Sequence, residues 1–102
     1  MESYLLNGVG PGGVEYSGVL EITSTASPSR YELQWIVTGA VLEGEGTVQG
    51  DRLEAEWHTV EEPQDGPRGT VVYTIMPDGE LRGDRTVAGS DGVFTETAIP
   101  VR

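Results

Sequence analysis

The sequence predicts an all-β fold, in which eight antiparallel strands of one domain meander up and down and close into a barrel. Apolar and polar residues alternate with a period of two through most of the chain, and turn-forming residues separate the alternating segments. No stretch of 12 residues has the apolar spacing of a helix. The chain length suits a single core, so residues 1–102 are expected to form a single domain.

The expected strands are bounded by Gly, Pro, Asp and Ser, residues that turns favour. The connections between consecutive strands are short, which favours a meander over a Greek key, and eight such strands with one apolar face can close into a barrel. The expected strands are 3–8, 14–24, 30–38, 41–49, 52–59, 69–76, 80–88 and 93–101.

Within each central strand, the alternation assigns one face to the core and the other to water. Carboxylates such as Glu21, Glu32 and Glu43 take the outward positions, as in an antiparallel sheet with a single buried face. The inward positions between 14 and 59 are Tyr16, Gly18, Leu20, Ile22, Tyr31, Leu33, Trp35, Val37, Leu42, Gly44, Gly46, Val48, Leu53, Ala55 and Trp57. Those of the next two strands are Val71, Tyr73, Ile75, Leu81 and Gly83.

Two turns set the register of their hairpins. The Gly-Asp pair at 50–51 fits a two-residue loop, and the Pro-Asp-Gly segment at 77–79 fits a three-residue loop that ends in a left-handed Gly79. In each hairpin we expect an aromatic ring to lie across a strand glycine and to fill the space of its missing side chain. The resulting pairs are Trp57 with Gly44 and Tyr73 with Gly83.

The last expected strand leaves two ways for the sheet to end. Segment 93–101 is partly polar, and Pro100 cannot donate to a ladder, which is typical of an edge strand. The barrel is therefore either closed or incompletely closed at this strand, and a homodimer through this C-terminal edge would cover an open one. The alternative architecture is a two-sheet β-sandwich of the same strands.

Alternate connections of an up-and-down barrel lie at the same end. One end gathers the longer, Gly-rich connections, so we expect the mouth of any binding cavity there. The connections at that end are 9–13, 39–40, 60–68 and 89–92, and those at the other end are 25–29, 50–51 and 77–79.

Charge and composition exclude several classes of partner and of chemistry. The chain has 17 acidic residues and six basic ones, a net charge of −11, which repels nucleic acid and anionic membranes, so we expect neither as a partner. The absence of Cys excludes disulfides and thiol catalysis. The N-terminal residues lack the basic and apolar regions of a signal peptide, which predicts a cytoplasmic protein, or a secreted one if a leader has been removed.

The residues that carry catalysis are sparse. His58 is the only His, and the predicted register places it on the outer face opposite Glu43, with Glu45 opposite Glu56 beside it. No Ser lies in a Gly-x-Ser-x-Gly elbow, and the alternation assigns no acid to the inner face. We therefore expect no enzymatic activity, no metal site and no cofactor.

Five aromatic residues are the candidate ligand-binding set. Their inward positions allow two interpretations: a filled core, which is usual in small barrels, or a cup in which the rings line a pocket and their polar atoms bind a ligand. The five are Tyr16, Tyr31, Trp35, Trp57 and Tyr73.

The pattern over residues 14–85 resembles a family of small bacterial β-proteins, some of which are described as fibronectin-binding, and more loosely the avidin and lipocalin barrels. The resemblance implies a meander barrel and leaves the ligand open. From the fold and composition together we expect a non-catalytic role in binding or interaction with a protein partner, and the alternative is a carrier of a small hydrophobic ligand. The residues that carry it are Tyr16-x-Gly18-x-Leu20, Tyr31-x-Leu33-x-Trp35, Gly44-x-Gly46, Gly50-Asp51-x-Leu53-x-Ala55-x-Trp57 and Tyr73-x-Ile75-x-x-Asp78-Gly79-x-Leu81-x-Gly83.

Overall fold

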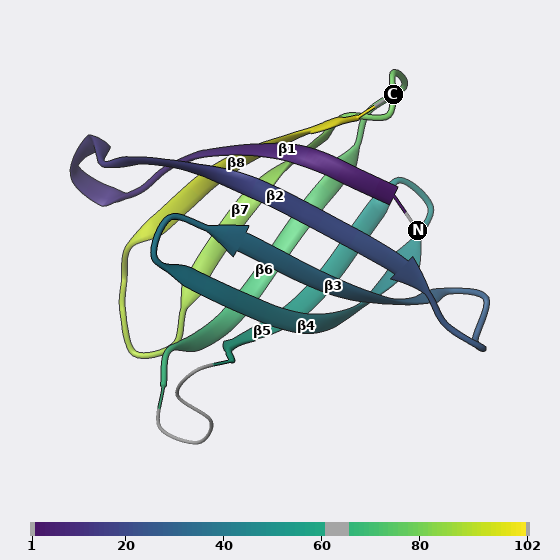
Figure 1. The fold of residues 1–102 in the computed structure, drawn as a ribbon, viewed down its shortest axis with the longest axis horizontal. Coiled ribbons are helices and arrows are strands. Elements are labelled where there is room, and N and C mark those ends of the chain that lie inside the picture. Colours follow the sequence, from purple (N-terminus) through teal and green to yellow (C-terminus); the bar gives the residue numbers. More distant parts are fainter. Residues whose placement is uncertain (1, 61–65, 102) are drawn as a thin grey trace.

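The computed structural model describes residues 2–60 and 66–101, which form one closed barrel of eight antiparallel strands in sequence order (Figure 1). The predicted fold class is confirmed, and every predicted strand boundary lies within one residue of the observed one. The strands are β1 (Glu2–Val9), β2 (Glu15–Ser24), β3 (Arg30–Val37), β4 (Ala40–Gln49), β5 (Arg52–Thr59), β6 (Arg68–Ile75), β7 (Leu81–Val87) and β8 (Val93–Pro100), with a short 3₁₀ turn at Pro11–Gly13.

The barrel closes through β8, which is hydrogen-bonded to both β7 and β1. Ile99 lies opposite Leu5, Pro100 takes the last position of the ladder opposite Tyr4, and the chain returns to the ladder beyond it. The expectations of an open barrel or a two-sheet sandwich are therefore wrong. The free edge on which the predicted homodimer depended is absent, because β8 has a partner on each side.

The two predicted hairpin registers are confirmed. Gly50 and Gly79 have φ angles of 64° and 92°, the left-handed conformation that each turn type requires. The observed pairs include Gly44 with Trp57, Glu43 with His58, Glu45 with Glu56, Tyr73 with Gly83 and Ile75 with Leu81.

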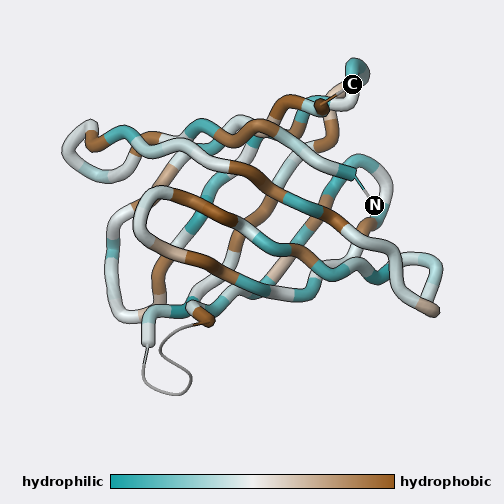
Figure 2. The backbone as a smooth tube through the Cα atoms, in the orientation of Figure 1, coloured by the Kyte–Doolittle hydropathy of each residue, from teal (hydrophilic) through white to brown (hydrophobic). Residues whose placement is uncertain are grey.

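The core occupies the barrel interior, and hydropathy alternates along the strands as expected (Figure 2). Leu20, Trp35, Val71 and Tyr73 are fully buried at its centre. The interior also contains two charged residues, Arg85 on β7 and Glu96 on β8, so the expectation of an inner face without an acid is wrong. The alternation that places Leu81 and Gly83 on the inward face continues to position 85, so the Arg85 side chain also points into the barrel.

The prediction that aromatic rings fill the space beside Gly44 and Gly83 is wrong. A Cβ at Gly44 would collide with the carbonyl oxygen of Glu56, and a Cβ at Gly83 would collide with that of Val72. The space that each missing side chain leaves is therefore taken by the backbone of the neighbouring strand, which the bending of the sheet brings close, and not by an aromatic ring.

The two ends of the barrel carry the predicted sets of connections (Figure 1). The expected mouth is the end where β1 joins β2, β3 joins β4, β5 joins β6 and β7 joins β8. Of the long connection at 60–68, residues 61–65 lie outside the described residues. Within the described ranges, the structure contains no helix with the length and apolar character to cross a membrane.

Replacing Gly44 with Ala should lower the free energy of unfolding by about 1–3 kcal/mol, because the new methyl group meets backbone that only a shift of β5 can clear. Gly46→Ala, on the same face of the same strand, should cost less, since its closest new contact is 2.9 Å from the Glu54 carbonyl oxygen. Urea denaturation of both variants would measure the difference, and equal losses would contradict this account of Gly44.

Candidate functional site

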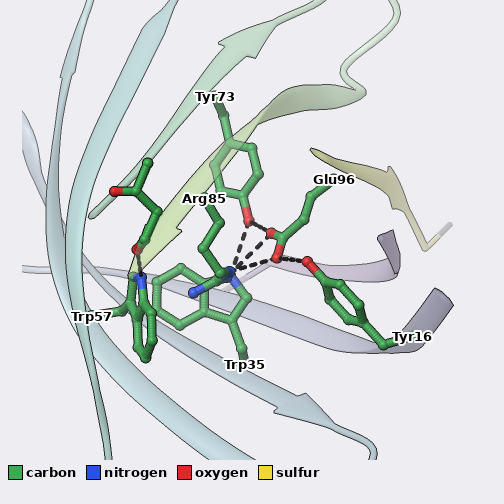
Figure 3. Close-up of polar contacts among 7 residues, drawn as sticks. Tyr16, Trp35, Trp57, Tyr73, Arg85 and Glu96 are labelled. Atoms are coloured by element: carbon green, nitrogen blue, oxygen red, sulfur yellow. Dashed lines mark hydrogen bonds and ion pairs between the residues drawn. The ribbon is translucent and has the colours of Figure 1, made fainter. Parts of the chain in front are cut away.

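The candidate site is built around a buried ion pair near the expected mouth. Arg85 of β7 and Glu96 of β8 point into the barrel, where 5% and 0% of their side chains are exposed (Figure 3). Arg85 Nε donates to Glu96 Oε2 at 2.5 Å, and Nη2 donates to Oε1 at 3.2 Å. The two parallel hydrogen bonds form a bidentate pair, which fixes the orientation of the guanidinium relative to the carboxylate.

Both carboxylate oxygens of Glu96 accept a second hydrogen bond from a tyrosine. Tyr16 donates to Oε2 at 2.5 Å, and Tyr73 donates a short hydrogen bond to Oε1. Trp35 Nε1 in turn donates to the Tyr73 hydroxyl at 3.0 Å. The carboxylate therefore has two donors on each oxygen, which satisfies it within the protein.

Glycines make room for this arrangement. Glu96 lies opposite Gly83 on β7 and opposite Gly8 on β1, so neither neighbouring strand has a side chain at its level. Gly8 also lies opposite Tyr16, and a Cβ there would overlap the Tyr16 ring. Gly8 is thus the glycine against which an aromatic ring packs. Its missing side chain lets the Tyr16 hydroxyl reach the Glu96 carboxylate.

The guanidinium of Arg85 packs against both tryptophans of the chain. Its Cζ lies 4.7 Å from the ring centroid of Trp35 and 5.1 Å from that of Trp57, distances that allow cation–π attraction. Trp57 Nε1 donates to the carbonyl oxygen of Thr86 at 3.2 Å, which holds its ring beside Arg85.

One atom of the site has no hydrogen-bond partner. Arg85 Nη1 is buried and is the one such side-chain atom found among the described residues. It points away from Glu96, on the side where Trp57 lies (Figure 3). A charged donor in this position offers a hydrogen bond that the protein does not use.

Burial and the neighbouring charges shift the ionisation of the site. Burial raises the pKa of the Tyr16 and Tyr73 hydroxyls well above the usual range, and the charge of Glu96 raises both further. Burial lowers the pKa of Arg85, but the hydrogen bonds and charge of Glu96 outweigh it and leave the pKa above its ordinary value. The site therefore keeps both phenols protonated and Arg85 charged at neutral pH.

The structure gathers four of the five predicted ligand-binding residues. Tyr16, Trp35, Trp57 and Tyr73 all contact the ion pair or its partners, whereas Tyr31 lies toward the opposite end of the barrel, opposite Gly46 of β4. Their binding of a ligand stays a prediction. Sequence reasoning missed the pair itself, although extending the alternation through β7 and β8 would have found it.

The residues of the acidic outer wall lie apart from this site. His58 lies opposite Glu43 on the outside of β4 and β5, beside a surface hollow of about 820 Å³. The neighbouring Glu45 forms an exposed ion pair with Arg30 at 2.8 Å. In the part of the chain that the structure describes, no three His, Cys, Asp or Glu residues are grouped so that they could hold a metal ion.

Glu96→Leu alone should lower the free energy of unfolding by about 3–5 kcal/mol, because it leaves the Arg85 charge buried without its counter-ion. The double variant Arg85→Met/Glu96→Leu should regain most of that loss, because no buried charge remains. Urea denaturation followed by tryptophan fluorescence would measure both. Equal losses in the single and double variants would contradict the account of the pair.

Stability should be insensitive to tyrosine ionisation below about pH 10 and should fall as the pH rises further. The raised pKa of Tyr16 and Tyr73 means that the unfolded chain releases their protons first, so alkali favours unfolding. The chain contains no Lys and no Cys, so tyrosines are the side chains that titrate in this window. Denaturation across this range should show a shallower fall for Tyr73→Phe, and an unchanged slope would contradict the prediction.

The comparisons with known proteins concern the fold. No protein-family model matches the chain, and no curated protein matches its sequence. The bacterial fibronectin-binding and avidin–lipocalin resemblances therefore stay predictions.

Several solved structures match over nearly the full length of both chains, among them redesigned and de novo designed β barrels. The redesigned barrel mFAP1, bound to DFHBI, has a TM-score of 0.79 at 14% identity over 95% of this chain and 91% of its own. The redesigned barrel b11L5F_LGL has a TM-score of 0.80 at 13% identity over 98% and 90%. A fluorescence-activating barrel that was designed de novo has a TM-score of 0.69 at 17% identity over 97% and 91%. At these identities the likeness is one of fold alone: a small, closed, eight-stranded meander barrel.

Proposed function

We propose that this chain is a non-catalytic binding protein that takes a small ligand at the end of the barrel next to Arg85. The ligand class is a compact aromatic or apolar molecule with an anionic oxygen. The observation that carries the proposal is the buried, unpartnered Nη1 of Arg85 beside the rings of Trp35 and Trp57. A ligand oxygen would satisfy this donor, and the rings would contact the ligand body.

The energetics favour a ligand of this kind. A buried donor without an acceptor costs about 1–3 kcal/mol, and more when it is charged, so an acceptor supplied by a ligand recovers free energy that the empty protein lacks. Glu96 already balances the formal charge of Arg85, and the aromatic faces add attraction to the cation. Nη1 is therefore the atom of the pair whose hydrogen-bonding capacity is entirely free.

The route to Arg85 is from the expected mouth. The inward-facing residues nearest that end, including Tyr16, Val37 and Phe94, are only partly buried. Deeper in the barrel, Trp35 and Tyr73 are fully buried and fill the interior. This filling argues against the alternative of a deep apolar cup for a large hydrophobic ligand and favours a short ligand between the rim and the guanidinium.

The same geometry argues against catalysis. Glu96 would be the natural inward base, but each of its oxygens already accepts two hydrogen bonds. His58 lies on the outer wall, on the far side of the sheet from the ion pair. The binding role has a parallel in fold, since the designed barrels mFAP1 and mFAP0 are bound to DFHBI.

The test uses benzoate as the anionic aromatic probe, benzamide as its neutral counterpart, and DFHBI in parallel. We expect saturable binding of benzoate by calorimetry, with benzamide weaker by about tenfold because its neutral carbonyl oxygen is a weaker acceptor for the guanidinium than a carboxylate. Both tryptophans of the chain contact Arg85, so their fluorescence should change on binding. Absence of saturable binding by benzoate and DFHBI alike would overturn the proposal.

Two variants locate the binding. Arg85→Met/Glu96→Leu removes the guanidinium without stranding a buried charge, and it should abolish benzoate binding in a folded barrel. Arg82→Met is the matched control, because Arg82 is an exposed arginine of the same strand that pairs with Glu80 on the outer wall. Binding that survives the double variant but fails in Arg82→Met would place the ligand outside the barrel.

A further inference from the structure

The outer wall of the barrel is divided between a charged side and an uncharged side. On β4 and β5, outward positions carry Glu43, Glu45, Glu54, Glu56 and His58. On β1, by contrast, the outward side chains are Ser3, Leu5, Asn7 and Val9, of which none is ionisable. This asymmetry occurs in a chain whose net charge is −11, so the uncharged side is a distinct surface.

The strand that closes the barrel continues the uncharged side. The outward side chains of β8 are Val93, Thr95, Thr97 and Ile99, again without a charge. β8 and β1 are hydrogen-bonded neighbours, so their outward side chains form one continuous surface, which we call the β8–β1 face.

An apolar band crosses this face and continues around the wall. Ile99 lies opposite Leu5, Leu5 opposite Val19, Val19 opposite Ile36, and Ile36 opposite Val41, so five adjacent strands contribute one outward apolar residue each. Ile99, Leu5 and Ile36 are 43%, 54% and 45% exposed. A contiguous exposed band of this kind is typical of an interaction surface rather than of scattered surface residues.

We propose that the β8–β1 face, with its apolar band, is the interface of a homodimer, in which a second copy of this chain packs the same face against it. The proposal is independent of the ligand site, because the face is built from outward side chains and Arg85 and Glu96 point inward. The contact is between side chains on two closed walls and does not require a free strand edge.

Charge favours a second copy as the occupant. Two copies that met through their β4–β5 walls would bring like charges together, whereas a two-fold contact through the β8–β1 faces leaves those walls on opposite outer sides. Glu21 and Glu43 flank the band where it crosses β2 and β4, so the self-complementary part of the wall is the β8–β1 face itself. The polar residues of that face are Ser3, Asn7, Thr95 and Thr97, whose side chains both donate and accept hydrogen bonds. The hydrogen-bonding groups of this face can therefore pair with those of an identical face, and no charge is buried without a partner.

The size of the face sets the strength of the contact. The barrel wall curves away from a flat partner, so β8, β1 and the adjacent β2 form the contact. A strand of this length runs about 26 Å and three adjacent strands span about 14 Å, which gives about 370 Å² on each copy. The pair then covers about 750 Å², less than the roughly 1,000 Å² of a stable specific interface and within the range of transient ones. We therefore expect a weak, reversible dimer that forms as the concentration rises.

Sedimentation equilibrium from micromolar to millimolar concentrations tests the proposal. We expect the average mass of the chain to rise from 10.9 kDa toward twice that value. Leu5→Glu and Ile99→Glu each place a charge in the apolar band and should weaken self-association at least tenfold, by about the cost of burying an unpaired charge. Both positions are exposed, so the variants should keep the fold, which far-ultraviolet circular dichroism checks.

Thr74→Glu is the matched control, because it adds the same charge at an exposed position on β6, between Arg52 and Arg82. It should dimerise like the parent chain, and concentration-dependent amide shifts in NMR spectra should be confined to β8 and the strands of the band. A chain that stays monomeric at millimolar concentration would overturn the proposal. So would self-association that Leu5→Glu leaves intact, or a monomer whose β8–β1 face binds uncharged phosphatidylcholine vesicles instead.

Discussion

The buried ion pair between Arg85 and Glu96 is the interaction on which the inside of this barrel depends. Bringing two charges out of water costs several kcal/mol for each, so the pair persists only where its geometry is good and further hydrogen bonds to the carboxylate offset the lost hydration. Glu96 meets this condition through Arg85, Tyr16 and Tyr73, and the guanidinium is covered by two indole rings. The aromatic residues near the mouth are therefore oriented by the pair as well as packed around it.

The strand glycines allow the close packing that the buried ion pair and the closed barrel require. Gly8 and Gly83 lie opposite Glu96 on either side, and the missing side chain of Gly8 leaves the space that the Tyr16 ring occupies. At Gly44 and Gly83 the neighbouring strand comes so close that no Cβ fits, which marks where the sheet bends sharply to close. Closure of the barrel and satisfaction of the pair by protein groups thus both depend on strand glycines.

Much of the fold could be read from local chemistry. Period-two alternation and the glycines at 50 and 79 fix faces and register over a few residues, and neither depends on distant parts of the chain. The ion pair was missed because charged residues were placed on the solvent-facing side according to their residue type. The alternation along β7 nevertheless puts Arg85 on the inward face. The sequence predicted a barrel but left its closure at β8 open, since a partly polar strand with Pro100 resembles an edge until its inward residues are seen to meet partners from β2, β6 and β7.

The closing ladder has a consequence for the order of events during synthesis. β1 and β8 join the two extremes of the chain, so the entropy of forming their contacts is lost over the longest possible loop. Arg85 leaves the ribosome 11 residues before Glu96, and in the interval its charge has no counter-ion in the nascent barrel. The chain consequently has little reason to compact around its polar centre before β8 has been synthesised.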